Sequence, residues 1–491
     1  MFEMNTPIGP VSVTMLVYGI NFIFILAVIF FERKTSTATL AWIMVLAFIP
    51  VLGFILYLVF NQNLTRIKIN KLYDDEKSVL RGYLDYQIKE VESGHLKPSN
   101  ISSDKWRELI VLNQVYGKAI YTDANDVELI TDGNELFEHM IEDISNAKAS
   151  ISAEYFIIKN DKIGKRFISE LTKKAAEGLE VRLLIDSLGS RNINNTVLKK
   201  YLAAGGKVAY FFPPRLAKLG VKIGLNLNYR NHRKILIIDN AIGYTGGYNI
   251  ANEYCDMVPK FGHWRDSHVR IRGIGVNELN ARFILDWRFV TKEKLDLLEA
   301  DRINTEAAGN MGLQIVSCGP EAHKQEIKRG FMKIITTARE SVYIQSPYFV
   351  PDAPILESCK MAAQSGVKVN IMIPKMPDHI FVYWATYSYV GELLRDGCRV
   401  FIYDGGFMHA KAIFADGEVT SIGSCNFDIR SFKLNFETNA VIFDKSFTKS
   451  MERSFEEDIK NSHELTLEAY NNRSLFIRFK ESVSRLLTEI L

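Results

Sequence analysis

Two long apolar stretches, residues 11–31 and 38–60, stand near the start of the chain with a short charged loop between them. Each is about 20 residues long, and a helix of that length crosses a hydrocarbon core of roughly 30 Å. A cleaved signal peptide fits less well, because no Lys or Arg precedes the first stretch and a second stretch follows at once. The pattern predicts a two-helix transmembrane hairpin over residues 1–61.

Basic residues beside these stretches indicate an orientation. The loop between them carries Arg33 and Lys34, and the segment after the second carries Arg66, Lys68 and Lys71. Lys and Arg are enriched on the cytoplasmic side of membrane proteins. The balance therefore favours a multi-pass protein of the cell membrane whose main body is cytoplasmic.

Further along, short apolar runs alternate with amphipathic segments, and this pattern occurs twice. Residues 151–186 and 342–374 both show a strand, a loop, a helix, a glycine turn and a second strand, with Tyr155 matched to Tyr348. Apolar runs rich in β-branched residues are typical of strands in a sheet that is covered on both faces. A repeat of this length indicates a duplicated domain rather than a solenoid.

The fold class that follows is α/β, with two similar domains after the hairpin. We expect a juxtamembrane connector over residues 62–108, a first domain over 109–305 and a second domain over 306–491 that ends in additional helices. The two domains are called the first half and the second half below.

Each half carries one set of polar residues with the same spacing. The sets are His232, Lys234, Asp239, Gly246, Gly247 and Asn249 in the first half, and His409, Lys411, Asp416, Gly423, Ser424 and Asn426 in the second. Histidine and lysine two residues apart on a strand point to the same face. The aspartate five residues after the lysine falls on the other face or in the following turn, which favours a supporting role. One acidic residue follows each set, Asp266 and Glu437.

These residue types together meet the needs of phosphodiester transfer. Lysines place positive charge on the phosphate oxygens, and asparagines add neutral donors. One neutral imidazole can attack phosphorus while the other protonates the leaving alkoxide. A carboxylate on the second ring nitrogen fixes each imidazole. We therefore expect one site without a metal or cofactor, built from His232, His409, Lys234, Lys411, Asn249, Asn426, Asp266 and Glu437.

The two sets resemble the motif of the phospholipase D superfamily, which is His-x-Lys, an aspartate five residues on, then Gly-Gly/Ser-x-Asn. The resemblance covers roughly residues 110–480 and, with the apolar N-terminal stretches and phrases such as "NFDIRSFKLNFETN", is nearest to the bacterial cardiolipin synthases. It implies two phospholipase D-like domains with pseudo-twofold symmetry. It also implies that His232, Lys234, Asp239, His409, Lys411 and Asp416 form the catalytic motifs.

The same resemblance implies a reaction. Two phosphatidylglycerols give cardiolipin and glycerol through a phosphatidyl-histidine, with His232 favoured as the nucleophile. A phospholipase D-type hydrolase, or a synthase that transfers to another head group, remains an alternative, as does, more distantly, a non-catalytic membrane scaffold. The first motif has Gly247 where the superfamily often has serine, a difference expected to alter phosphate hydrogen bonding slightly.

Composition narrows the range of possible partners and ligands. A net charge of +3 over 491 residues lacks the basic excess of nucleic-acid binders, so we expect phosphatidylglycerol, cardiolipin and the membrane as partners, not nucleic acid. The five cysteines form no Cys-x-x-Cys pair, which gives no metal-ligand spacing. Homo-oligomerisation is left open.

Two segments have two interpretations each. Residues 213–230 are basic and partly apolar, so they either touch an anionic lipid surface or form an ordinary surface loop. Residues 379–393 are rich in aromatic residues, so they either line an entry for acyl chains or form a helix packed on the sheet.

Overall fold

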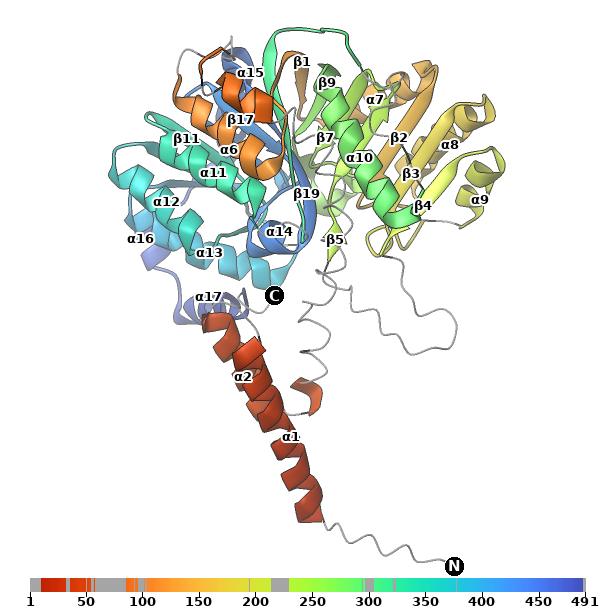
Figure 1. Cartoon of the computed structure of the whole chain (residues 1–491). Helices are drawn as coiled ribbons and strands as arrows, with labels where there is room; N and C mark the ends of the chain where they lie inside the picture. Colours follow the sequence, from red (N-terminus) through yellow and green to blue (C-terminus); the bar gives the residue numbers. More distant parts are fainter. Residues whose placement is uncertain are drawn as a thin grey trace, which may run out of the picture.

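The computed structural model of the chain is shown in Figure 1. It describes residues 10–31, 36–49, 51–53, 57, 85–91, 93–95, 101, 104–193, 195–212, 229–293, 295, 304–320, 324–376 and 378–488. Most of the predicted connector and the basic segment at 213–228 lie outside these residues.

One sheet runs through both halves. Its strand order is β20-β14-β13-β11-β16-β17-β19-β10-β1-β9-β7-β6-β2-β3-β4, and β5 joins at β19. The order is nearly the same when it is read outward in both directions from the junction of β10 and β1. The predicted duplication is therefore visible in the topology. The strands of the two halves join edge to edge at β10 and β1 to form the one sheet.

The strands of the first half are β1 (Thr122–Ile130), β2 (Ser150–Tyr155), β3 (Glu180–Asp186), β4 (Lys207–Phe211), β5 (Arg230–Asn231), β6 (Lys234–Ile238), β7 (Ile242–Gly246), β8 (His263–Arg265) and β9 (His268–Gly273). Its helices are α7 (Gly133–Asn146), α8 (Lys162–Ala176), α9 (Asn195–Ala203) and α10 (Val276–Thr291).

The strands of the second half are β10 (Met311–Cys318), β11 (Ser341–Gln345), β12 (Phe349–Val350), β13 (Lys368–Pro374), β14 (Arg399–Tyr403), β15 (Gly406–Met408), β16 (Ala412–Ala415), β17 (Val419–Gly423), β18 (Phe427–Asp428), β19 (Asn435–Phe443) and β20 (Ser462–Glu464). Its helices are α11 (Glu326–Thr337), α12 (Ala353–Gln364), α13 (Ile380–Arg395), α14 (Ile429–Lys433), α15 (Lys445–Lys460), α16 (Leu467–Asn471) and α17 (Leu475–Thr488).

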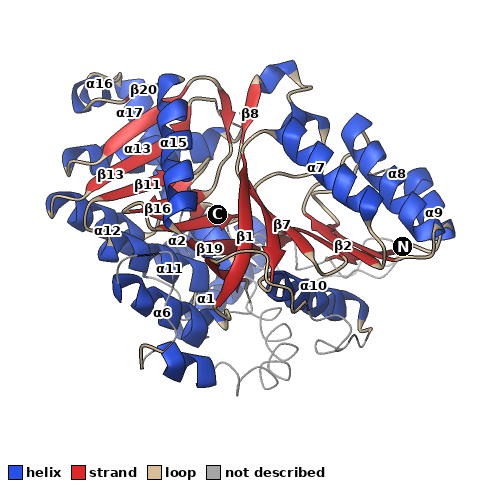
Figure 2. Ribbon diagram, turned by 90° about the horizontal axis from the view of Figure 1, so that it is seen from above, coloured by secondary structure: helices blue, strands red, loops and turns tan. Residues whose placement is uncertain are grey.

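Helices cover both faces of the sheet (Figure 2). On one face lie α7 and α8 with α15, and on the other lie α10 with α11 and α12. Equivalent helices of the two halves, such as α10 and α15, therefore lie on opposite faces, as a twofold axis in the plane of the sheet requires. The inner strands are accordingly buried along almost their whole length, as the apolar runs predicted.

The predicted glycine turns precede the second strand of each repeat. Gly178 and Gly366 have φ angles of 93° and 91°, a left-handed conformation that glycine adopts at little cost. Helix starts are set by acidic caps: Asp132 accepts backbone N–H bonds at the start of α7, and Asp161 does so at α8. Local sequence thus fixes where the crossover helices begin and where they end.

The segment before β1 packs differently from its predicted assignment. Residues from 109 were expected to belong to the first half, yet α6 (Arg107–Gly117) packs against α11 of the second half. Trp106 is fully buried there, and its Nε1 donates to Glu418 at 2.9 Å. An apolar helix surface packs wherever a complementary core lies, and here that core belongs to the second half.

Near the N-terminus the structure describes α1 (Pro10–Phe31) and α2 (Ser36–Phe48), where the hairpin was predicted. The second helix is shorter than the expected span at 38–60, part of which lies outside the described residues. Within the described part of the chain, no helix has both the length and the apolar character needed to cross a membrane.

Candidate active site

Each motif histidine lies where a strand of its own half meets a strand of the other half. His232 follows β5, which pairs in parallel with β19, and its backbone N–H donates to the Phe436 carbonyl at 2.9 Å. His409 follows β15, which pairs in parallel with β8, and its N–H donates to the Arg265 carbonyl at 2.7 Å. Equivalent backbone bonds across the interface therefore hold both histidines.

The two acidic residues predicted beside the histidines contact them, but in a crossed arrangement. His409 Nδ1 lies 2.6 Å from Asp266 Oδ2, and His232 Nδ1 lies 3.3 Å from Glu437 Oε1. Both carboxylates are fully buried. A carboxylate at Nδ1 favours the tautomer that carries its proton there, which leaves the Nε2 lone pair free for chemistry. Each half thus supplies the carboxylate for the histidine of the other half.

These carboxylates remain ionised although they are buried. Burial raises the pKa of Asp266, but Lys411 and His409 outweigh it and hold the pKa below its ordinary value. For Glu437, the histidine and the lysine of the first motif outweigh burial in the same way and lower its pKa. The site is therefore a closely balanced cluster of buried charges.

The two motif lysines are buried beside their own histidines. Lys234 Nζ donates to the His232 carbonyl at 2.5 Å, and Lys411 Nζ donates to the His409 carbonyl. Burial lowers the pKa of Lys234 to about 8, an effect that Glu437 opposes and Lys411 reinforces. Burial also lowers the pKa of Lys411. Because charges of each motif act on groups of the other, both motifs belong to one site.

Aromatic rings surround His409. Its ring centroid lies 5.1 Å from that of Trp264, 5.8 Å from Phe407 and 6.5 Å from Tyr254. Burial lowers the pKa of His409 to about 4, and the charge of Lys411 adds to this while Asp266 opposes it. The imidazole of His409 is therefore neutral near pH 7 before an anion enters the site.

His232 has a more open environment. Its ring centroid lies 4.3 Å from that of Phe156, with the two rings tilted by 48°, and its side chain is 21% exposed, against 14% for His409. Asn435 Nδ2 lies 3.3 Å from His232 Nδ1 and donates to Glu437 at 3.1 Å. The two histidines are thus chemically inequivalent despite the equivalent backbone around them.

The motif asparagines also differ. Asn249 accepts from the Ile157 N–H at 3.1 Å and donates to Tyr254 Oη at 3.0 Å, so its amide is engaged within the protein. The side-chain oxygen of Asn426 is buried and has no hydrogen-bond partner among the described residues. The unpaired atom of Asn426 is an acceptor, so a contact between this residue and a phosphate oxygen would come from its Nδ2 instead.

The glycine-to-serine difference between the motifs has a steric cause. A Cβ atom on Gly247 would lie 2.0 Å from Asp266 Oδ1, so the position has no room for a side chain. At the equivalent position, Ser424 Oγ donates to Glu437 at 2.6 Å. The sequence predicted an effect on the phosphate, whereas the structure places the difference against the carboxylate.

Asp239 and Asp416 lie at the far end of the motif strands. Five residues of strand separate each from its lysine by about 16 Å. Asp239 accepts three backbone N–H bonds, from residues 148–150, at 2.7 to 2.9 Å, and Asp416 does the same for residues 339–341. Such bonds stabilise turns. The family motif groups both aspartates with the reacting histidines and lysines, but in the structure they lie away from those side chains.

Sequence reasoning missed several residues of the site. Asn435 and Trp264 precede Glu437 and Asp266 by two positions, so the duplication itself could have indicated them. Arg233, between the histidine and lysine of the first motif, is fully buried and donates to Asp286 at 2.7 Å and to Thr438 at 3.1 Å. An internal arginine between two halves has no local sequence signal.

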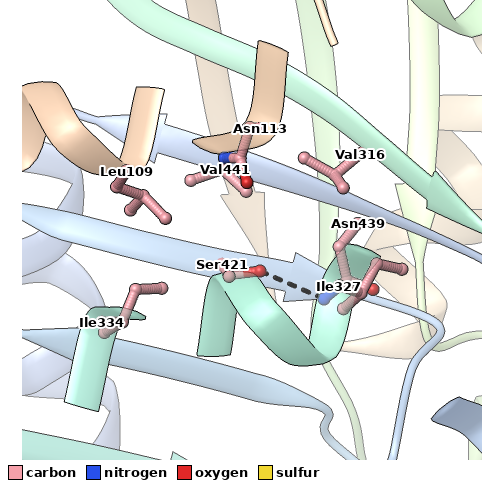
Figure 3. Close-up of a pocket in the computed structure, with 9 residues that line it drawn as sticks. Leu109, Asn113, Val316, Ile327, Ile334, Ser421, Asn439 and Val441 are labelled. Carbon is pink, nitrogen blue, oxygen red and sulfur yellow. Dashed lines mark hydrogen bonds between the residues drawn. The ribbon is translucent and has the colours of Figure 1, made fainter. Parts of the chain in front are cut away.

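A cavity of about 10 Å³ lies between α6, α11 and the strands β17 and β19 (Figure 3). Asn439 donates to Ser421 at 3.2 Å on its wall. This volume is close to that needed for one water molecule, and neither motif histidine lines it.

Comparison with known proteins identifies related families and relatives. The family described as "Cardiolipin synthase, PLD-like domain" matches residues 140–258 and 331–459, and the family "Phospholipase_D-nuclease N-terminal" matches residues 19–61. The chain is 45% identical over 477 residues to the "Major cardiolipin synthase ClsA" of Bacillus subtilis (strain 168), covering 97% of this chain and 98% of that protein. It is 45% identical over 473 residues to the "Cardiolipin synthase" of Listeria monocytogenes serotype 4a (strain HCC23), covering 96% and 97%.

Among solved structures, a phosphatidylserine synthase from Haemophilus influenzae Rd KW20 matches 78% of this chain and all of its own. The TM-score is 0.57 at 15% sequence identity, which shows a shared fold. The relatives that align over nearly the whole chain, and the family model that matches it twice, identify the protein family as well as the fold. This chain belongs to the cardiolipin synthase family of phospholipase D-like proteins.

Proposed function

We propose that this protein is a phosphatidyltransferase that converts two phosphatidylglycerols into cardiolipin and glycerol through a phosphatidyl-histidine. The observation that carries the proposal is one buried site with two His-x-Lys pairs, each histidine bound at Nδ1 by a carboxylate of the other half. Relatives named cardiolipin synthase, which span nearly the whole chain, support the choice of lipid.

In the first half-reaction, Nε2 of His232 attacks phosphorus of the donor phosphatidylglycerol. The bond from phosphorus to the head-group oxygen breaks, and His409 gives that oxygen a proton so that glycerol leaves. The assignment of attack to His232 rests on its more open side chain and on the expectation from the family motif. The lysine ammonium groups offset the charge that builds up on the phosphoryl oxygens.

In the second half-reaction, His409 Nε2 removes a proton from a head-group hydroxyl of the second phosphatidylglycerol. The resulting oxygen attacks phosphorus, and the bond from phosphorus to His232 breaks. Both histidines regain their starting protonation states, so the cycle needs no oxidant, metal or cofactor.

The low pKa of His409 fits this sequence once the substrate charge is included. The repulsion from Lys411 helps to lower that pKa to about 4. An anionic phosphate between the lysines offsets their charge, which raises the pKa of His409 and favours its protonated form. Substrate binding would therefore prepare the general acid. Asn426 would donate to the phosphate, while Asp239 and Asp416 would support the turns.

The N-terminal helices would anchor the enzyme in the cell membrane as a hairpin, with the body in the cytoplasm. Support comes from α1, whose exposed side chains are apolar, including Met15 at 71%, Phe22 at 60% and Phe30 at 79%. Such exposure is costly in water and favourable in lipid. The basic residues Arg66 and Lys68, on which the orientation depends, lie outside the described residues.

The test is incubation of the purified full chain with phosphatidylglycerol vesicles, followed by mass analysis of the lipids. Cardiolipin and glycerol should appear in equal amounts, and both His232→Ala and His409→Ala should abolish them. His463→Ala is the matched control, because His463 is exposed and bound to Asp404. Phosphatidic acid without cardiolipin would replace the proposal by a hydrolase.

A phosphatidyl adduct identifies the nucleophile. Brief reaction with labelled phosphatidylglycerol, digestion and peptide mass analysis should find the adduct on His232, and the His232→Ala variant should carry none. An adduct on His409 would reverse the assignment of roles.

A further inference from the structure

The C-terminal helix α17 is oriented opposite to an ordinary surface helix. Its exposed side chains include Leu475 at 80%, Phe476 at 65%, Phe479 at 64% and Leu486 at 74%, whereas Glu481 on its inner face is 3% exposed. At about 100° per residue, the four apolar side chains fall within an arc of roughly 100°. They form one continuous face, called the α17 outer face below.

Polar contacts fix this orientation. Arg473 binds Glu481 through bonds of 2.8 and 2.9 Å, and Tyr470 lies beside the same carboxylate at 3.4 Å. Arg485 pairs with Glu392 of α13. Because the charged groups point inward and are paired, turning the helix to bury its apolar side would break these contacts. These polar contacts therefore hold the apolar face of the helix outward.

Basic side chains border the α17 outer face. Arg478 is exposed on one side, and on the other Lys480 Nζ lies 4.4 Å from the Phe476 ring centroid and 5.0 Å from that of Trp384. Apolar and aromatic residues flanked by Lys and Arg are the composition of helices that lie in the interface of an anionic bilayer. The charges therefore match an anionic lipid better than a second copy of this basic face.

The α17 outer face continues onto the start of α13. Lys480 lies over Trp384, and Arg485 contacts Ser388 of the same helix, so the two helices run parallel and their first turns are level. At the start of α13, Ile380 is 66% exposed and Phe381 is 56% exposed. Both helices lie at the end of the globular body from which α1 and α2 project (Figure 1).

The start of α13 also borders the active site. Asp378, which precedes it, hydrogen-bonds Tyr348, and its charge acts on both His409 and Lys411. The His379 ring centroid lies 6.1 Å from that of Tyr348. The apolar surface thus reaches from the outer helix to the neighbourhood of the reacting groups.

We propose that the α17 outer face and the start of α13 lie in the surface of an anionic bilayer and bring the active site close to it. This inference extends the proposed function by naming the surface through which the lipid arrives. Phosphatidylglycerol then presents its head group to the site while its acyl chains stay in the membrane.

The position of the helix can be measured without the reaction. All five native cysteines are buried, so a single Phe479→Cys in the full chain can be labelled with a fluorophore. Leu202→Cys on α9 is the matched control, as an apolar side chain 47% exposed on the first half. In phosphatidylglycerol vesicles that carry nitroxide-labelled acyl chains, the label at 479 should be quenched strongly and shielded from iodide, and the label at 202 should show the reverse.

Equal quenching of the two labels by the lipid nitroxide would overturn the proposal. So would self-quenching of the label at 479 that depends on protein density, since that outcome would mean that a second copy covers the face. The quenching of both labels does not depend on whether the protein makes cardiolipin. A failure of this proposal can therefore be distinguished from a failure of the proposed function.

Activity gives an independent readout. Phe476→Ser with Phe479→Ser should reduce transfer from bilayer phosphatidylglycerol about tenfold, because each buried aromatic ring contributes to interfacial binding. The same variant should keep the wild-type rate on a short-chain phosphatidylglycerol below its micelle concentration. An equal loss on both substrates, or no loss on either, would contradict a role at the lipid surface.

Discussion

The crossed carboxylates make Asp266→Asn the most informative substitution. Asp266 is fully buried, accepts from Ser267 N–H at 2.7 Å and lies 2.6 Å from His409 Nδ1. Asparagine has nearly the same shape and keeps a hydrogen bond to the ring, but it removes the negative charge and permits the wrong tautomer. The fold should persist while the chemistry fails.

The size of the loss follows from what the carboxylate supplies. A hydrogen bond to a charged group contributes about 1.5–3 kcal/mol. The uncompensated charge of protonated His409 beside Lys411 adds to this, so a total of about 3–4 kcal/mol, or 100- to 1,000-fold in kcat, is expected. Glu437→Gln should lose less, because the 3.3 Å contact to His232 is longer and Asn435 also lies beside that ring.

The pH dependence has a defined sign. Asp266 raises the pKa of His409, against burial, which lowers it. Its removal lowers that pKa further, so the protonated form needed for glycerol release becomes rarer and the alkaline side of the rate profile, where activity falls as pH rises, moves to lower pH.

Initial rates of cardiolipin formation in phosphatidylglycerol vesicles between pH 5 and pH 9 test both the size and the sign. Asp256→Asn, an exposed partner of His263 at 2.8 Å, is the control and should stay within about twofold of wild type. An Asp266→Asn enzyme within about threefold of wild type, with an unmoved pH profile, would refute the orienting role.

Four further outcomes are expected. As pH rises through about 8, Lys234 loses its proton, so kcat/KM should fall on the alkaline side, and Lys234→Arg, which stays charged, should move that limb upward when rates are followed to pH 10. Gly247→Ala should displace the Asp266 carboxylate and lower kcat about 100-fold in the same vesicle assay, with an unfolding transition that moves to lower temperature but stays cooperative as the sign that the fold survives. Asp239→Ala should remove the carboxylate that accepts three backbone N–H bonds and cost about 2–4 kcal/mol, seen as a melting temperature lower by roughly 5–10 °C with kcat of the folded enzyme nearly unchanged. Arg233→Ala should leave a buried carboxylate less well compensated and cost about 3–5 kcal/mol in denaturant unfolding, and a loss below 1 kcal/mol would exclude Arg233 as a major tie between the halves.

The duplicated pattern was enough to predict the two α/β halves, the buried strands and the glycine turns. It also suggested that both motifs form one site, because equivalent residues meet when they lie near the axis that relates the two halves. The matching of Tyr155 to Tyr348 was two residues out of register. Ser150 and Ser341 bind the equivalent motif aspartates, and counting from them places Tyr155 level with Ser346.

What could not be predicted depends on contacts between distant segments. The exchange of Asp266 and Glu437 between the halves arises from strand pairs β15 with β8 and β5 with β19, which no local pattern encodes. The same holds for α6, whose apolar face could have packed on either half. For residues 379–393 the helix was one of the two predicted interpretations, and the structure gives α13, with a packed middle and an exposed start.

The exchange of carboxylates has an evolutionary consequence. A substitution at Asp266 in the first half changes the histidine of the second half, and a substitution at Glu437 does the converse. Selection therefore acts on the two copies together at these positions. Each copy can still change independently where its residues make no contact with the other half. Second-site suppressors of a damaged histidine environment should accumulate in the opposite copy, and a single copy could form this arrangement only by pairing with a second one.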